Sequence, residues 1–152
     1  MPTITTCLWF QTDANEPAAF YTGLFPDSRI LSATPSERSG GTSIVSFELW
    51  GRPFLALGGG AEVALNYATS LQVPCETQEE LDRYWDVLAA GGAEQQCGWL
   101  TDKFGLSWQI VPTILPGLLS HPDPAQADRV LKAMLGMAKL DIAGLLAAAS
   151  AG

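Results

Sequence analysis

The stretch Asp102–Pro112, DKFGLSWQIVP, reads as a turn followed by a strand, and the same alternation of apolar and polar residues identifies other strands of the chain. After Asp-Lys-Phe-Gly, apolar and polar residues alternate, with Trp108 and Ile110 on one face and Gln109 on the other. Alternation with a period of two is typical of a strand that buries one face. The sequence therefore predicts that Gln109 points away from the core, and it raises the question of what its amide meets.

The two halves of the chain have the same predicted order of a strand, a helix and further strands. The strands predicted in the first half are residues 4–11, 29–33, 43–49 and 53–57. The helix of this half follows Asp13, a favourable N-cap residue, and stops at Pro26. The strands predicted in the second half are residues 69–73, 94–100 and 106–111. Its helix starts with a capping box of Thr77 and Glu80.

A shift of 63 residues aligns the halves, placing Leu8 on Leu71 and Tyr21 on Tyr84. Few residues are identical, but the periods agree, which favours a duplicated strand–helix–strands unit. Two unrelated strand–helix pairs remain the alternative explanation.

We expect an α+β fold in a single domain over residues 1–152, with mixed and mainly antiparallel strands. The two modules are predicted at residues 1–62 and 63–114, with residues 115–152 as a helical tail. A helix is predicted over residues 125–139 of this tail, which we expect to cover the domain or a partner subunit.

The composition excludes several classes of partner. The chain has 152 residues and a net charge of −8, from 8 basic and 16 acidic side chains. Nucleic acids and anionic membrane surfaces need clustered cations, so neither is an expected partner. No apolar run reaches the roughly 18 residues of a membrane span and no secretion signal opens the chain, so we expect a cytoplasmic protein.

Cysteine and histidine are too scarce for several kinds of site. Cys7, Cys75 and Cys97 are odd in number and lack CxxC spacing, which indicates neither a disulfide framework nor a zinc site. The only histidine, His121, lies in a Ser-His-Pro-Asp-Pro linker. A Ser-His-Asp triad, a Cys-His pair or a histidine cage would depend on that residue.

Four motifs in order carry a resemblance to a known family. They are LWFQTDANEPAAFYTGLFPDSRI, VPCETQEELDRYWDVLAAGG, EQQCGWLTDKFGLSWQIVP and RVLKAMLGMAKLDIAGL. The chain resembles the PhnB-like family of the glyoxalase/bleomycin resistance/dioxygenase (vicinal oxygen chelate) superfamily. The resemblance implies two βαβββ modules whose strands form a cup, in a homodimer.

Many proteins of this family carry the label demethylubiquinone methyltransferase. That chemistry calls for a glycine-rich turn between a strand and a helix to hold an adenosyl cofactor. The run Gly58–Gly60 follows a predicted strand, but the residues after it are a poor helix start, so these glycines are interpreted as a module junction.

Metal-using members of the superfamily bind a divalent cation through four side chains, from the first and last strand of each module. Carried over by strand parity, the equivalent positions here are Thr5, Ala56, Ala68 and Gln109. Two alanines and a threonine supply almost no donor, so we expect neither a metal site nor a cofactor.

The remaining side chains of the implied cup are aromatic or neutral and polar. The candidate ligand-binding residues are Cys7, Trp9, Phe54, Ser70, Gln72, Trp99, Ser107 and Gln109. Such a set is typical of a small-molecule pocket, in which rings stack and an amide fixes orientation.

The sequence leaves several functions open. One is a metal-independent small-molecule-binding protein of the superfamily, and another is an enzyme acting on a small organic substrate. In the latter case no catalytic residue can be assigned, because the amide of Gln109 does not titrate. The same side chains can also simply fill the interior, and the protein can act through its dimer surface.

Overall fold

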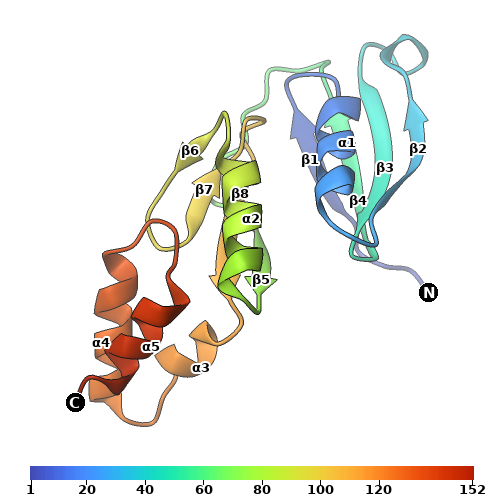
Figure 1. Ribbon diagram of the computed structural model, residues 1–152. Helices are drawn as coiled ribbons and strands as arrows, with labels where there is room; N and C mark the ends of the chain where they lie inside the picture. Colours follow the sequence, from blue (N-terminus) through green and yellow to red (C-terminus); the bar gives the residue numbers. More distant parts are fainter. The chain divides into compact units, whose positions relative to one another are not determined.

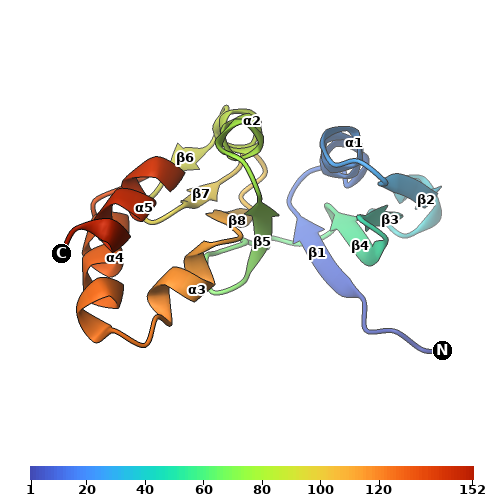
Figure 2. The ribbon, with the colours of Figure 1, turned by 60° about the horizontal axis from the view of Figure 1, so that its bottom comes forward.

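The computed structural model describes residues 1–152, which form two compact units, Met1–Leu65 and Asn66–Gly152 (Figure 1). The boundary falls after Leu65, whereas the predicted module boundary falls after residue 62. Each unit has a four-stranded sheet with a helix against one face, as Figure 2 shows. The mixed α+β class expected from the sequence is confirmed.

The first unit is a strand, a helix and three further strands. Its elements are β1 (Thr6–Phe10), α1 (Asn15–Leu24), β2 (Arg29–Thr34), a short 3-10 helix (Ser36–Arg38), β3 (Ser43–Leu49) and β4 (Arg52–Gly58). The sheet order is β1-β4-β3-β2, with β1 parallel to β4 and the other pairs antiparallel.

The core of the first unit lies between the sheet and α1. Leu8 and Phe10 are 3% and 1% exposed, and the Phe10 ring centroid is 6.3 Å from that of Tyr21 on the helix. The predicted cap is displaced, since the N-cap residue is Ala14 and not Asp13. The carboxylate of Asp13 instead accepts the backbone N–H of Asn15 at 2.9 Å.

The second unit repeats the order with a shorter outer strand. Its elements are β5 (Ser70–Cys75), α2 (Gln78–Ala89), β6 (Ala93–Glu94), β7 (Trp99–Thr101) and β8 (Ser107–Pro112). The sheet order is β5-β8-β7-β6, and β5 runs parallel to β8. The Thr77 half of the predicted capping box is confirmed, because the Thr77 hydroxyl accepts from the Glu80 N–H. The Glu80 carboxylate accepts instead from the N–H of Glu76, the residue before the N-cap.

The continuous strand predicted over residues 94–100 is wrong. Residues 95–98 form a turn between β6 and β7, in which Cys97 has φ 62° and Gly98 has φ 81°. A left-handed backbone cannot continue a pleated strand. The alternation of the sequence does not reveal this break.

The DKFG turn at Asp102–Gly105 is organised by a buried carboxylate. Asp102 is 3% exposed and accepts the indole N–H of Trp108 at 2.8 Å. It also accepts the backbone N–H groups of Phe104 and Leu106 at 2.8 and 3.1 Å. This turn therefore fixes Trp108 in the core and sets the phase of β8.

The C-terminal tail belongs to the second unit. It contains α3 (Leu115–Leu119), α4 (Pro124–Leu135) and α5 (Ile142–Ser150). The predicted helix over residues 125–139 is too long, because α4 ends at Leu135 with Gly136 as its C-cap. No helix of the chain combines the length and the hydropathy that a membrane crossing needs.

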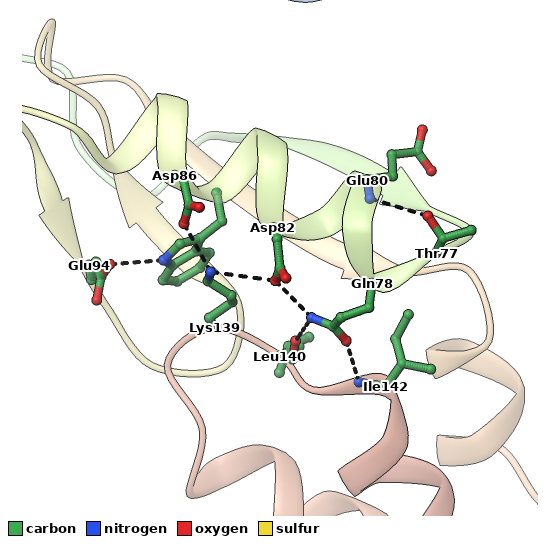
Figure 3. A network of polar contacts seen from close by, with 10 residues as sticks. Thr77, Gln78, Glu80, Asp82, Asp86, Glu94, Lys139, Leu140 and Ile142 are labelled. Atoms are coloured by element: carbon green, nitrogen blue, oxygen red, sulfur yellow. Dashed lines mark hydrogen bonds and ion pairs between the residues drawn. The ribbon is translucent and has the colours of Figure 1, made fainter.

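Polar contacts tie the tail to α2 (Figure 3). The Gln78 amide donates to the Leu140 carbonyl at 3.1 Å and accepts from the Ile142 N–H at 2.9 Å. Lys139 reaches Asp82 and Asp86 at 3.4 and 2.9 Å. We call this set of contacts, Gln78, Asp82 and Asp86 with residues 139–142, the tail clamp.

Candidate functional site

One face of the second sheet is not covered by α2 and carries polar side chains. The residues on it include Ser70, Gln72, Trp99, Thr101, Ser107 and Gln109, of which Ser107 is only 1% exposed. Cross-strand register places Gln109 beside Gln72 on one side and Trp99 on the other. The opposite face is apolar, since Ile110 and Leu100 are fully buried. The alternation predicted for β8 is confirmed, and this open face is the candidate site.

The Gln109 amide is held by its neighbours on β5. Its Nε2 donates to the Ser70 hydroxyl at 2.8 Å, and its Oε1 accepts from the Gln72 amide at 3.5 Å. The first bond is short and the second is long enough to be weak. Gln109 therefore has a fixed donor side, while its oxygen retains capacity for another donor.

A hollow of about 300 Å³ adjoins this polar row and is lined by Tyr67, Gln95, Gln96 and Trp99. Trp99 connects the two features, because it lines the hollow and is the cross-strand partner of Gln109. The Gln95 amide donates to the Thr101 hydroxyl at 3.2 Å. The volume is at the lower end of the range for ligand pockets, about 300–1,000 Å³.

Sequence reasoning missed three residues of this hollow. Tyr67 lies in the segment before β5, and Gln95 and Gln96 lie in the predicted but absent strand. The turn at Cys97 brings them beside Trp99. No sequence signal for a positive φ is visible at a cysteine, which seldom adopts one.

The first sheet also has a face away from its helix, on which Cys7 and Trp9 lie. The Trp9 indole N–H donates to the Gly59 carbonyl at 2.8 Å, which fixes the ring. Partial burial raises the pKa of the Cys7 thiol. Burial, with a smaller contribution from the Glu80 carboxylate, raises the pKa of Cys75 to about 12. Neither thiol is therefore prepared as a nucleophile.

Two of the predicted positions lie on the other face of the first sheet. Phe54 and Ala56 are 4% and 0% exposed and pair with Thr6 and Leu8 of β1, whose side of the sheet α1 covers. The Phe54 ring stacks on Phe47 of the core at 5.3 Å. The prediction that they face the cup is wrong.

The error arose from the sequence of β4, PFLALG, which is apolar at both parities. Hydrophobicity alone therefore does not set its phase. Leu55 and Leu57, which pair with Cys7 and Trp9, take the open face instead.

The side chains at the positions equivalent to metal ligands do not form a donor set. Thr5 is exposed and precedes β1. Ala68 is exposed in a turn, in which its backbone N–H donates to the side-chain oxygen of Asn66. Ala56 is buried under α1, and the leucines that replace it on the open face have no donor atom. Of the four positions, Gln109 alone has a ligand-type side chain on an open sheet face.

No group of three or more His, Cys, Asp or Glu side chains in the chain is close enough to hold a metal ion. A divalent transition metal needs several imidazole, thiolate or carboxylate ligands. The residues present in either unit do not fit such an ion.

Comparison with known proteins places these features in a family. A family model described as 3-demethylubiquinone-9 3-methyltransferase matches residues 2–111 and ends before the helical tail. A PhnB protein from Bacillus cereus, whose description also carries the methyltransferase label, is 35% identical, with a TM-score of 0.67. The match covers 74% of this chain and 100% of that one. No curated protein matches the chain.

Two further solved structures share the fold. Protein PA1353 from Pseudomonas aeruginosa is 18% identical over 73% of this chain and 96% of its own, with a TM-score of 0.57. The fosfomycin resistance protein FosX from Listeria monocytogenes, in complex with Mn(II) and sulfate, is 14% identical. It covers 70% of this chain and 88% of its own, with a TM-score of 0.53.

Proposed function

Because the chain belongs to the PhnB-like family of the vicinal oxygen chelate superfamily, we propose that it binds a small organic molecule without a metal ion. The binding site is the open face of the second sheet around Gln109. A homodimer in the cytoplasm, suggested by the family resemblance and the composition, is part of the same proposal.

The observation that carries the proposal is the arrangement of Gln109 between Ser70 and the hollow beside Trp99. A half-buried amide that donates at 2.8 Å to a neighbouring hydroxyl has a defined orientation before a ligand arrives. An aromatic wall next to a fixed hydrogen-bonding group is the common composition of small-molecule sites. Preorganisation of this kind lowers the entropic cost of binding.

The chemistry of the available donors supports metal independence. Thr5, Ala56 and Ala68 cannot replace the imidazole and carboxylate ligands that superfamily metal sites use. The Mn(II) belongs to the FosX structure, and FosX shares only its fold with this chain.

The methyltransferase description of the family model is not part of the proposal. Gly58 ends β4, and residues 61–69 contain no helix before β5 begins at Ser70. The glycine at position 58 has a packing explanation, since a Cβ there would overlap the backbone of Thr12 and Ala14. The turn that would hold an adenosyl cofactor is therefore not formed by these glycines.

Binding is favoured over catalysis because the strand residues of the open face are neutral. General acid–base chemistry needs a group that titrates near the working pH, and hydroxyls and amides do not. An enzymatic role would require a titrating side chain from elsewhere in the chain or from a partner subunit.

A thermal-shift screen tests the proposal. Chelator-treated protein is heated with a library of neutral, anionic and cationic small molecules, and hits are repeated on Gln109→Leu and on the control Gln126→Leu, a half-buried glutamine of α4. A true ligand at about 100 times its Kd adds about 2.7 kcal/mol of stability. That corresponds to a rise of roughly 5–10 °C in Tm. The shift should be lost in Gln109→Leu and kept in Gln126→Leu, whereas equal shifts in both variants would place the site elsewhere.

A further inference from the structure

We propose that the hollow lined by Tyr67 and Trp99 takes the planar end of an uncharged ligand, an aromatic or heteroaromatic ring bearing a carboxamide or lactam. The inference rests on the proposed function, because it names the chemical class of the molecule bound on the open face of the second sheet. It comes from three features of that face: its lack of charge, its aromatic walls and the direction of its hydrogen-bonding groups.

The strand residues of this face carry no charge, and the nearest acids in the sequence point elsewhere. Glu94 pairs with Leu100, whose side chain is in the core, and its carboxylate accepts the indole N–H of Trp85 at 2.9 Å. Asp102 is 3% exposed and bonded to Trp108. A carboxylate or ammonium group on the ligand would therefore lose water without gaining a counter-charge, which is unfavourable.

The turn that precedes β8 does not supply a cationic side chain to the site. Lys103 of this turn lies over the ring of Phe104, with its nitrogen 5.1 Å from the ring centroid. The whole chain carries a net charge of −8, which adds long-range repulsion against an anionic ligand. The site thus discriminates most strongly against acids.

Two aromatic rings make the walls of the hollow. Trp99 is half-buried on β7, and Tyr67 is 72% exposed before β5. Aromatic side chains favour stacked or edge-to-face contact with another ring. A volume of about 300 Å³ suits one ring system with a short substituent.

The hydrogen-bonding groups around the hollow call for a ligand that both accepts and donates. Three side-chain groups have no hydrogen-bond partner in the chain: the indole N–H of Trp99, the hydroxyl of Tyr67 and the side-chain amide of Gln96. The Gln109 oxygen, engaged at 3.5 Å, can accept a further donor. A carboxamide or lactam supplies a carbonyl acceptor and an N–H donor from one planar, neutral group.

The wall formed by Gln95 and Gln96 is held in place from behind. The adjoining Cys97 N–H donates to the Met137 carbonyl and the Gly98 N–H to the Ala138 carbonyl, each at 2.8 Å. These bonds maintain the left-handed backbone at Cys97, φ 62°. The tail therefore holds the wall of the hollow in place before a ligand binds.

A matched set of probes tests the ligand class. Nicotinamide and benzamide are titrated into 15N-labelled protein beside their acids, nicotinate and benzoate, and the amine 3-picolylamine. The readout is the Trp99 indole N–H resonance, assigned by its loss in Trp99→Phe. We expect the two amides to shift this resonance and to bind about tenfold more tightly than the acids and the amine.

Variants separate the hollow from other aromatic surfaces. Tyr67→Ala and Trp99→Ala should each weaken nicotinamide binding about fivefold or more, whereas replacement of Trp50, a tryptophan of the first unit that is 39% exposed, by alanine should not. A two-dimensional amide spectrum of each variant establishes that it is folded. If Tyr67→Ala loses its fold, Tyr67→Leu, which removes the ring and hydroxyl but keeps apolar bulk, replaces it.

The outcomes distinguish the two proposals. Acids or amines that shift Trp99 as strongly as the amides, or amides that bind without shifting it, would overturn the ligand class and leave small-molecule binding standing. Absence of any bound molecule in both this series and the broader screen would overturn both.

Discussion

The side chain of Leu140 lies so close to Gly98 that a Cβ at position 98 would come within 3.0 Å of Leu140 Cδ1. Leu140 is fully buried, and Gly98 has φ 81°. The N–H of the same glycine donates to the Ala138 carbonyl of the tail, and its carbonyl accepts the N–H of Ile110 in β8, each at 2.8 Å. The tail, the turn after β6 and the central strand of the site therefore meet at one residue that must lack a side chain.

Gly98→Ala should destabilise the protein by about 1–3 kcal/mol, because it adds both a left-handed alanine and an overlap with Leu140 and Ile110. Gly105→Ala is the matched control, since Gly105 has φ 89° but open space around its Cα. It should cost about 1 kcal/mol, the conformational part alone. Urea unfolding of the two variants measures the difference, and equal losses would show that the overlaps with Leu140 and Ile110 contribute nothing.

Gln78→Ala should loosen the tail clamp. The variant loses the bonds to the Leu140 carbonyl and the Ile142 N–H, each worth about 1 kcal/mol. Amide hydrogen exchange at residues 140–142 should accelerate in Gln78→Ala and remain unchanged in Gln126→Ala. Unchanged exchange in both variants would mean that apolar burial of Leu140 alone holds the tail.

The tail clamp should weaken in acid. A hydrogen bond from Gln78, together with the nearby Lys139 ammonium, lowers the pKa of the Asp82 carboxyl. A lowered pKa in the folded state gives stability that is present above the unfolded value, about 3.9, and is lost as the pH falls below it. The urea midpoint of the parent should therefore decline more steeply below about pH 4 than that of Asp82→Asn. Parallel curves would contradict this contribution.

The cysteines should react slowly. The raised pKa of Cys7 and the pKa of about 12 at Cys75 leave both as thiols at neutral pH. Alkylation of Cys7 by iodoacetamide, followed by mass spectrometry, should be slower at pH 7.5 than that of a cysteine peptide and should rise steeply toward alkaline pH. A fast reaction at pH 7.5 would reveal an activated thiolate and reopen covalent catalysis.

The face of Gln109 was predictable because β8 alternates large apolar residues with polar ones. Trp108 and Ile110 fix one parity, so Ser107 and Gln109 must take the other. The cross-strand arrangement with Ser70 and Gln72 followed from the same alternation in β5. These parts of the site needed no knowledge of neighbouring segments.

The rest depended on contacts that alternation does not encode. In β4, Phe54 and Leu55 are both apolar, and pairing with β1 decides which one is buried. At Cys97 the left-handed turn depends on carbonyls of residues 137 and 138, some 40 residues along the chain. Tyr67 and Gln96 could not be connected to Trp99 without that turn.

One titration tests the central claim, that a small molecule binds around Gln109 without a metal ion. The Gln109 side-chain amide and the Trp99 indole N–H are followed by 15N NMR while a hit compound is added, first with excess EDTA and then with excess Zn(II), a divalent ion that does not broaden the resonances. We predict that both resonances shift with the same Kd in the two conditions. Loss of the shifts in EDTA and their return with Zn(II) would contradict the account.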